Sequence, residues 1–290
     1  MKAIIFGISG QDGFYLREIC TSESVEVLGI SRSRGPWLTG DVGDYSFVEG
    51  LIRTNQPGYV FHLAANSTTQ HSALFENHKT ISTGTLNILE AVCRYSPKTK
   101  VFLTGSAMQF ENRGLPIDEK TNWCASSPYS VARIQSTYAG RYYRKLGLDV
   151  YVGYLFNHDS PHRAERHISQ KIAKAVKRIS NGSKEIIEMG NLLVRKEHTF
   201  AGDVARAMWL LVNNDKNVYE CVIGSGKAYS IQSWLEACCA NFHINWQEIV
   251  KITETVIPEY DVLVSNPGLL LSLGWTQTVE IAELAGMMTK

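Results

Sequence analysis

The sequence lacks an excess of charge of either sign. Its 29 lysines and arginines are balanced by 28 aspartates and glutamates among 290 residues, which gives a formal net charge of +1. This balance excludes a general electrostatic attraction to nucleic acid or anionic lipid, although a local basic patch remains possible. Long hydrophobic runs are also missing, since none approaches the roughly 20 residues that cross a membrane. We therefore expect neither nucleic acid nor a membrane as a partner.

Metal-binding patterns are absent as well. The six cysteines are scattered without the spacing of zinc or iron–sulfur ligands. His158, His162 and His167 lie close in sequence, but Pro161 interrupts them and no carboxylate pattern completes a ligand set. The first residues enter a strand pattern directly, without a signal-peptide cleavage site. We expect a cytoplasmic protein with reduced cysteines and no metal.

The sequence does contain a regular alternation of strands and helices. Its composition, 44% hydrophobic and 20% charged, is that of a globular protein and excludes disorder. Short β-branched runs alternate with longer helical patterns through the first half, which predicts an α/β fold with a Rossmann doubly wound parallel sheet. The expected strands are 2–6, 25–31, 59–63, 100–104 and 149–156. One expected helix follows the loop at Gly13 and ends near Cys20, and the others cover 45–54, 83–95 and 128–146.

The strand and helix rhythm stops after Phe156, where a polar, charged stretch begins. This change predicts a smaller, discontinuous C-terminal lobe that binds substrate. A strand at 218–224 and a helix at 231–240 suggest that the chain returns to the sheet. We predict a dinucleotide-binding Rossmann domain of residues 1–157 and 218–242, and a nucleotide-sugar-binding lobe of residues 158–217 and 243–290.

A glycine-rich loop follows the first expected strand. Gly7, Gly10 and Gly13 have the spacing of the dinucleotide fingerprint, in which glycines allow a tight turn and a close approach of the pyrophosphate to a helix N-terminus. Gln11 and Asp12 lie within this loop and belong to the predicted site. The loop predicts a nicotinamide dinucleotide as cofactor.

The end of the second strand indicates which dinucleotide binds. A carboxylate there would pair with a ribose hydroxyl, but the sequence has Ser31-Arg32-Ser33-Arg34 instead. Arg32 and Arg34 suit a 2′-phosphate, so we predict NADP(H) in preference to NAD(H), the alternative being that either arginine is a solvated loop charge. Further cofactor contacts are expected from Asp41, Val42, Leu63, Ala64, Ala65 and Phe156.

Tyr129 and Arg133 lie four residues apart on one face of an expected helix, and Ser106 ends the preceding strand. With the glycine loop, these residues make the chain resemble the extended short-chain dehydrogenase/reductases, the NAD-dependent epimerase/dehydratase family. Within that family it is most similar to the GDP-mannose 4,6-dehydratases and the GDP-4-keto-6-deoxy-mannose reductases. The closer resemblance rests on the loop GISGQDG and on the run Leu155-Phe156-Asn157-His158-Asp159-Ser160-Pro161.

The resemblance implies a nucleoside-diphosphate sugar as substrate, with GDP as the expected nucleotide. Asn157 would line the substrate cleft, while Arg163, Lys171 and Lys196 would contact the diphosphate. The alternative for Lys171 is a solvated helix face. The family also implies a homodimer formed through the helix that carries Tyr129. For Tyr138, Tyr142 and Tyr143, farther along this helix, packing against a neighbouring helix is the favoured explanation.

Several positions depart from the family pattern. Dehydratases carry acidic residues after the active hydroxyl, but Ala107 and Met108 follow Ser106 here and cannot transfer protons. Arg133 replaces the family lysine, and Ile81 stands where Asn or Asp is usual. Arginine can still anchor the cofactor and hold a positive charge beside Tyr129, but it cannot deprotonate.

These departures favour an NADP(H)-dependent reductase of a GDP-4-keto-6-deoxy-hexose. Tyr129 would be the acid, Ser106 the hydrogen-bond donor to the carbonyl oxygen, and Arg133 the cofactor anchor. Two alternatives remain open. One is nucleotide-sugar 4,6-dehydratase or epimerase chemistry, and the other is a catalytically impaired, cofactor-binding partner protein.

Overall fold

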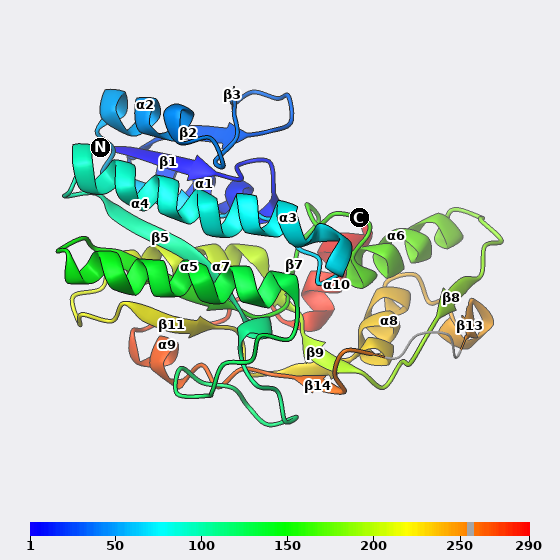
Figure 1. Cartoon of the computed structure of the whole chain (residues 1–290). Helices are drawn as coiled ribbons and strands as arrows, with labels where there is room; N and C mark the ends of the chain where they lie inside the picture. Colours follow the sequence, from blue (N-terminus) through cyan, green and yellow to red (C-terminus); the bar gives the residue numbers. More distant parts are fainter. Residues whose placement is uncertain (254–257) are drawn as a thin grey trace.

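The core of the molecule is a seven-stranded parallel sheet (Figure 1). The computed structural model describes residues 1–253 and 258–290. The strands lie in the order β11-β6-β5-β4-β1-β2-β3, and all neighbours pair in parallel. Their bounds are β1 Lys2–Phe6, β2 Glu26–Ser31, β3 Leu38–Thr39, β4 Tyr59–His62, β5 Lys100–Ser106, β6 Val150–Leu155 and β11 Glu220–Ile223.

Helices cover both faces of this sheet, because its strands are apolar on both sides. Along β1, Ala3 and Ile5 pack on one face, and Ile4 and Phe6 pack on the other. The first face is covered by α1 (Gln11–Ser22) and α7 (Ala201–Val212). The second is covered by α2 (Tyr45–Asn55), α4 (Gly84–Tyr95) and α5 (Pro128–Lys145), and α4 continues from α3 (Leu74–Asn77) through a π-helical turn at His78–Thr83.

The strand order reverses between β1 and β4. From β1 the chain builds outward through β2 and β3, and from β4 it builds the opposite way through β5, β6 and β11. A reversal of this kind leaves a crevice at the carboxyl ends of the two central strands, where ligands bind in doubly wound sheets. The predicted fold class is confirmed.

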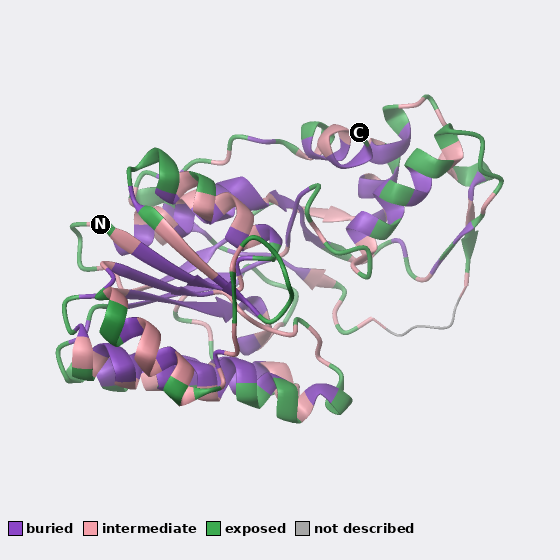
Figure 2. Cartoon of the chain, turned by 90° about the horizontal axis from the view of Figure 1, so that it is seen from above, coloured by how far each residue is buried: buried purple, intermediate pink, exposed green. Residues whose placement is uncertain are grey.

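A second apolar core lies beyond the carboxyl ends of the strands (Figures 1 and 2). It is formed by α6 (Ile168–Ser180), α8 (Ile231–Ala240) and α10 (Ile281–Thr289), around the fully buried Trp234. Short strands also pair outside the main sheet. They are β7 (His158–Asp159) with β10 (Thr199–Phe200), β9 (Arg195–Glu197) between β12 (Ala228–Ser230) and β14 (Val262–Leu263), and β8 (Ile187–Met189) with β13 (Val250–Ile252). Helix α9 (Gly268–Ser272) packs beside β11.

Three helices lie in a different core from the one that we predicted. Helix α9 lies within the predicted lobe range 243–290, yet Leu270 packs into the sheet core. Helix α7 was assigned to the lobe, yet Val204, Met208 and Leu211 pack into the sheet core. Helix α8 was assigned to the Rossmann domain, yet Trp234 and Leu235 pack into the second core. The apolar pattern of a helix shows that one face is buried but not which partner buries it. The predicted boundaries within 201–242 and the assignment of α9 therefore need this correction, while β11 does return to the main sheet.

No helix within residues 1–253 and 258–290 is both long enough and apolar enough to cross a membrane.

Candidate active site

Two clefts meet at the carboxyl ends of the central strands. The smaller, of about 360 Å³, lies over β1 and β2, and the larger, of about 760 Å³, extends toward the second lobe. They share four lining residues, Ser9, Gly10, Leu63 and Ala65. The arrangement is that of one elongated site bent around the glycine loop, with room for a two-part ligand.

The three glycines of the loop meet three different steric demands. Gly7 has a φ of +94°, and a Cβ there would lie 2.7 Å from the backbone nitrogen of Ala64. A Cβ at Gly13 would lie 2.6 Å from Cα of Ile8, so this glycine lets α1 pack closely on β1. A Cβ at Gly10 would meet only the Gly7 oxygen, at 3.4 Å, and Gly10 lines both clefts. These residues fit a dinucleotide, because Gly10 leaves the N-terminus of α1 open to a pyrophosphate.

The smaller cleft contains most of the residues predicted to bind the adenosine half of a cofactor. Gly7, Arg32, Asp41, Val42, Leu63, Ala64 and Ala65 line it, and Arg34 does not. The Arg32 guanidinium forms an ion pair with Glu76 at 2.9 Å, and Lys79 forms one with Asp41 at 2.7 Å. Sequence reasoning missed the hydroxyl of Ser31, which contacts those of Ser9 at 2.8 Å and Ser33 at 3.0 Å.

The three predicted catalytic residues lie together in the larger cleft, with Gln11, Asp12 and Phe156. Ser106 ends β5, and its Oγ accepts a hydrogen bond from the Met108 amide at 3.2 Å. Tyr129 lies in the first turn of α5, where the side chain of Ser127 caps the helix by accepting from the Ser130 amide. The sequence therefore places the hydroxyl and the phenol on two rigid elements that converge on one cavity.

Arg133 is held rigidly beneath Tyr129. Its Nη1 donates to the Thr104 carbonyl at 2.5 Å, and its Cζ lies 5.1 Å from the centroid of the Tyr129 ring. Only 3% of Arg133 is exposed, so its charge is poorly screened by solvent. Burial, followed by the positive charge of Arg133, lowers the pKa of the buried His62 to about 4. The guanidinium thus occupies the region of the family lysine as a permanent buried cation.

Three of the positions that depart from the dehydratase pattern, Ala107, Met108 and Arg133, face this same cavity. Ala107 and Met108 line the larger cleft, and the acidic residues among its described lining are Asp12 and Glu259. Asp12 is paired with His158, while Glu259 accepts a hydrogen bond from Thr69. Ile81 is fully buried in the π-helical turn and does not line the cleft.

The predicted substrate contacts separate into two groups. Asn157 and Arg163 line the larger cleft, and in the described part of the chain Asn157 Oδ1 and Arg163 Nε are buried without a hydrogen-bond partner. Lys171 instead lies on the exposed side of α6 and lines neither cleft. Lys196 is buried behind the lining, where burial lowers its pKa although the nearby Asp159 opposes the shift.

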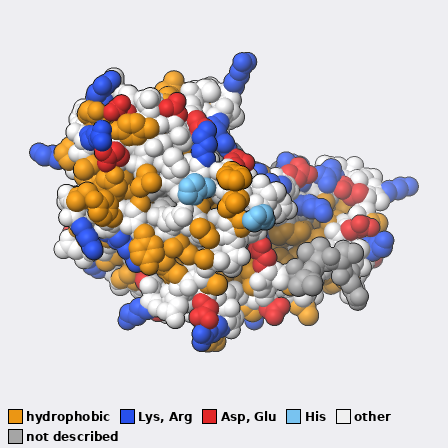
Figure 3. Space-filling view, in the orientation of Figure 1, with side chains coloured by type: hydrophobic (Ala, Val, Ile, Leu, Met, Phe, Trp, Pro, Cys, Tyr) orange, Lys and Arg blue, Asp and Glu red, His pale blue; other side chains and the backbone are white. Residues whose placement is uncertain are grey.

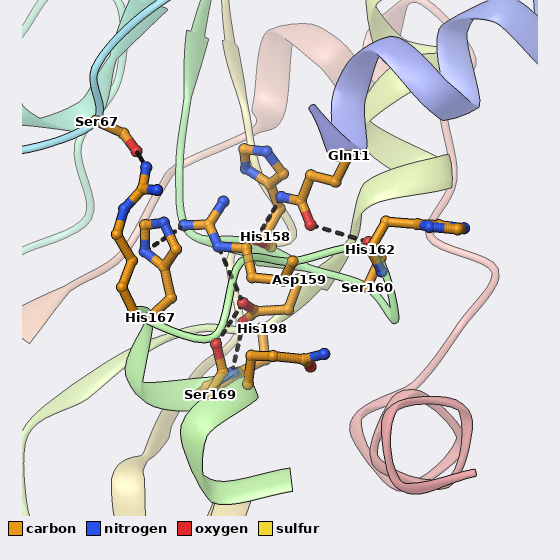
Figure 4. A network of polar contacts seen from close by, with 12 residues as sticks. Gln11, Ser67, His158, Asp159, Ser160, His162, His167, Ser169 and His198 are labelled. Carbon is orange, nitrogen blue, oxygen red and sulfur yellow. Dashed lines mark hydrogen bonds and ion pairs between the residues drawn. The ribbon is translucent and has the colours of Figure 1, made fainter. Parts of the chain in front are cut away.

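Figure 4 shows a polar network behind the substrate end of the cleft that the sequence did not predict. Asp159 accepts hydrogen bonds from Ser169 and from His198 Nδ1, the latter at 3.0 Å. Burial, and then the charges of Arg163 and Arg166, lower the pKa of the cleft residue His167 to about 4. The sequence signal for this network was the run from Asn157 to Pro161, which identified the segment that contains Asp159 but not Ser169 and His198, which contact it.

No group of three or more histidine, cysteine, aspartate or glutamate residues in the described ranges could hold a metal ion.

Comparisons with known proteins agree with this architecture. A family model described as GDP-mannose 4,6 dehydratase matches residues 4–288. GDP-mannose 4,6 dehydratase 2 of Arabidopsis thaliana is 29% identical over 99% of this chain and 85% of its own length. GDP-mannose 4,6-dehydratase of Sinorhizobium fredii is 29% identical over 81% of this chain and 74% of its own.

Solved structures are similar in fold at lower sequence identity. UDP-glucose 4-epimerase of Thermus thermophilus, in complex with NAD, superimposes with a TM-score of 0.85 at 19% identity, covering 100% of this chain and 98% of its own. RMD from Pseudomonas aeruginosa, complexed with NADPH, gives a TM-score of 0.86 at 18% identity, covering 99% and 96%. The resemblance read from the sequence is confirmed by the family match over nearly the whole chain. The chain belongs to the GDP-mannose 4,6-dehydratase family of extended short-chain dehydrogenase/reductases.

Proposed function

We propose that this protein is an NADP(H)-dependent reductase of a GDP-linked 4-keto-6-deoxy-hexose. The observation that carries the proposal is the composition of the larger cleft. Ser106, Tyr129 and Arg133 supply the parts that carbonyl reduction needs, while Ala107 and Met108 replace the acid and base that dehydration needs.

The reaction divides between the cofactor and the protein. Bound NADPH would supply the hydride that converts the carbonyl carbon into an alcohol carbon. The Tyr129 hydroxyl donates the proton that the carbonyl oxygen requires, and the Ser106 hydroxyl donates a hydrogen bond to the same oxygen. Arg133 stabilises the negative charge left on the phenol oxygen but cannot pass on a proton, so Tyr129 is reprotonated from cleft water.

The preference for NADP(H) rests on the end of β2. Arg32 and the hydroxyls of Ser31 and Ser33 line the smaller cleft, and the end of β2 carries these hydrogen-bond donors and no carboxylate. Such a group suits a 2′-phosphate. The structures of relatives complexed with NAD or NADPH support a nicotinamide cofactor of either kind.

The substrate end supports a diphosphate ligand. Arg163 lines the cleft, and its buried Nε makes no hydrogen bond among the described residues, although it forms an ion pair with Asp159 at 3.7 Å. Asn157 Oδ1 is the accompanying acceptor. We propose Asn157 and Arg163 as nucleotide-sugar contacts, whereas neither Lys171 nor Lys196 lines the cleft. The GDP linkage is carried over from the named activity of the curated relatives.

The test is a pair of assays on the purified protein. With NADPH and a GDP-4-keto-6-deoxy sugar we expect loss of the reduced-nicotinamide absorbance, and with GDP-mannose alone we expect no release of water. An Arg32→Ala variant should lose affinity for NADPH but not for NADH. Absence of NADPH oxidation would contradict the reductase assignment.

A dehydratase is the second candidate, because the matched family model and the curated relatives carry that name. It would have to recruit Asp12 or Glu259 in place of the missing acid and base, and both already have hydrogen-bonding partners. Water released from GDP-mannose would establish this alternative. Cofactor binding without any turnover on nucleotide sugars would instead indicate a catalytically impaired partner protein.

We also propose a homodimer, located in the cytoplasm. Exposed apolar side chains gather on the face formed by α4 and α5 (Figure 3), and they include Leu86, Tyr138 and Tyr142. Contiguous apolar surface of this kind is typical of protein interfaces.

A further inference from the structure

His158 and Asp12 form a pair at the junction of the glycine loop and the substrate lobe (Figure 4 labels His158). Asp12 is the second residue of α1, and His158 begins β7. The distance from His158 Nε2 to Asp12 Oδ1 is 2.8 Å, and the distance from His158 Nδ1 to the Phe156 carbonyl oxygen is 2.7 Å. Both residues line the larger cleft.

These two contacts determine the protonation of the imidazole. A carbonyl oxygen and an ionised carboxylate can only accept hydrogen bonds, so both ring nitrogens must carry a hydrogen for both contacts to form. A neutral imidazole would direct a lone pair at one of the two acceptors. The side chain of His158 is only 9% exposed, which leaves little water to relieve such a clash. The geometry therefore requires the imidazolium form.

The electrostatic surroundings agree with this form. Burial alone would lower the pKa of His158, but the charge and hydrogen bond of Asp12 outweigh it, and the pKa is raised. Burial likewise raises the pKa of Asp12, while His158, Arg163 and Arg133 together lower it below its usual value. Besides its own two members, the pair faces the charges of Arg163 from the lobe and Arg133 from α5. Arg163 opposes the imidazolium, so Asp12 is the group that holds it.

The location of Asp12 raises a difficulty that His158 solves. The N-terminus of α1 is where the proposed cofactor would place its pyrophosphate, and a carboxylate in that first turn repels a ligand carrying the same charge. An imidazolium hydrogen-bonded to the carboxylate turns this negative charge into a neutral pair. Gln11 holds the pair in place, because it donates to the His158 carbonyl at 3.1 Å and accepts from Ser160 Oγ at 2.9 Å.

We propose that His158 is a positioning residue whose imidazolium neutralises Asp12, and that this neutralisation permits the dinucleotide to bind at the N-terminus of α1. The inference rests on the proposed cofactor, but it concerns binding and not turnover. The pyrophosphate is common to NADPH and NADH, so the effect is the same for both. Affinity is therefore highest while His158 is protonated and falls as the pH rises through its pKa.

The experiment measures the dissociation constant of NADPH, and in parallel that of NADH, by nicotinamide fluorescence from pH 6 to pH 9.5. It compares the intact protein with His158→Gln, Asp12→Asn and the double variant. His243→Asn is the control, because His243 is an exposed residue just after α8. Circular dichroism and thermal unfolding report whether each variant is folded.

We expect His158→Gln to weaken both dinucleotides about tenfold or more, the effect expected when a charged group loses its partner. The intact protein should lose affinity at high pH. Asp12→Asn should abolish this pH dependence, because a neutral asparagine can donate to a neutral imidazole. The double variant should recover most of the affinity lost in His158→Gln, whereas His243→Asn should behave as the intact protein does.

Three results would overturn the inference. They are a pH-independent affinity of the intact protein, an unchanged affinity in His158→Gln, and a double variant as weak as His158→Gln, which would indicate a purely structural role. If His158→Gln does not fold, the pH series on the intact protein and on Asp12→Asn still decides. Binding with the expected pH dependence but no sugar reduction would refute the proposed function alone, and failure of the intact protein to bind either dinucleotide would refute both.

Discussion

At the scale of single residues, the chemistry depends on how a guanidinium replaces an amine. The hydrogen bond from Arg133 to the Thr104 carbonyl fixes the guanidinium under the Tyr129 ring, so its charge is held near the phenol. Unlike a lysine ammonium, the Arg133 guanidinium cannot release a proton at any physiological pH. In the proposed reduction, the proton that Tyr129 donates would therefore not pass through the residue four positions farther along α5.

The first prediction concerns Tyr129. Changing Tyr129→Phe removes the proton donor and should lower the turnover number of carbonyl reduction by about 10²-fold to 10⁴-fold. The measurement is steady-state oxidation of NADPH in the presence of the keto sugar. Tyr138→Phe is the matched control, since Tyr138 lies on the exposed side of the same helix and should retain turnover. Equal rates in the Tyr129→Phe variant and the intact protein would exclude Tyr129 as the acid.

The second prediction concerns stability against acid. Burial, and then the charge of Arg133, lower the pKa of His62 in the folded state to about 4, whereas an unfolded histidine titrates near 6.5. The unfolded chain therefore binds the proton first as the pH falls, and the folded state loses stability between about pH 6.5 and pH 4. At pH 5 this group should cost about 2 kcal/mol relative to pH 8.

Urea unfolding at pH 8 and pH 5 measures this cost. The difference in the free energy of unfolding between the two pH values should be smaller in His62→Gln than in the intact protein, because glutamine does not titrate. The comparison between variants is needed because other buried groups also titrate in this range. An identical pH dependence in both proteins would show that the pKa of His62 is the same in the folded and unfolded chain, and would contradict the lowered pKa.

At the scale of elements, the sequence predicted the sheet better than the lobe. The strand at 2–6 and the helix at 231–240 have the predicted bounds, because a change of apolar period marks their ends. The π-helical turn at His78–Thr83 was missed, since it continues the pattern of α4. The cores of α7 and α8 were misassigned because residues distant in sequence decide which surface a helix covers.

The third prediction concerns the junction of β1 and α1. Gly13→Ala should destabilise the fold and abolish dinucleotide binding, because the new Cβ would lie 2.6 Å from Cα of Ile8. Gly50→Ala is the matched control. Gly50 lies inside α2 with no atom within 4 Å of its Cβ position, so alanine should stabilise that helix by about 0.5–1 kcal/mol. Thermal unfolding of both variants shows whether Gly13→Ala lowers the melting temperature and Gly50→Ala raises it. A Gly13→Ala variant as stable as the intact protein would refute the close packing of α1 on β1.

At the scale of the whole molecule, the sequence predicted the parts of the site but not their pairings. The glycine loop and the Tyr129 helix were recognised because their spacing is local. The pairing of Asp12 with His158 joins residues 146 positions apart, and the ion pair of Arg32 with Glu76 joins residues 44 positions apart. Such contacts depend on how the lobe and the sheet come together, which no local pattern encodes.

The fourth prediction concerns assembly. A second copy would cover the apolar face formed by α4 and α5, so the intact protein should have the mass of a dimer in light scattering after size exclusion. The double variant Tyr138→Lys/Tyr142→Lys places two charges on this face and should yield a folded monomer. Leu193→Lys, on an exposed site of the lobe, should remain dimeric. A monomeric intact protein would contradict the proposed dimer.

The central claim is that this member of the GDP-mannose 4,6-dehydratase family reduces a keto sugar. The most direct measurement follows the label from NADPH carrying deuterium at C4 of the nicotinamide, with product analysis by mass spectrometry after incubation with a GDP-4-keto-6-deoxy sugar. We predict that each molecule of NADPH consumed transfers one hydrogen from C4 of its nicotinamide to the carbonyl carbon of the sugar, and that one alcohol product forms for each. NADPH with deuterium at both C4 positions would therefore give a product with one deuterium at that carbon. Unlabelled, unreduced sugar together with water released from GDP-mannose would contradict the claim.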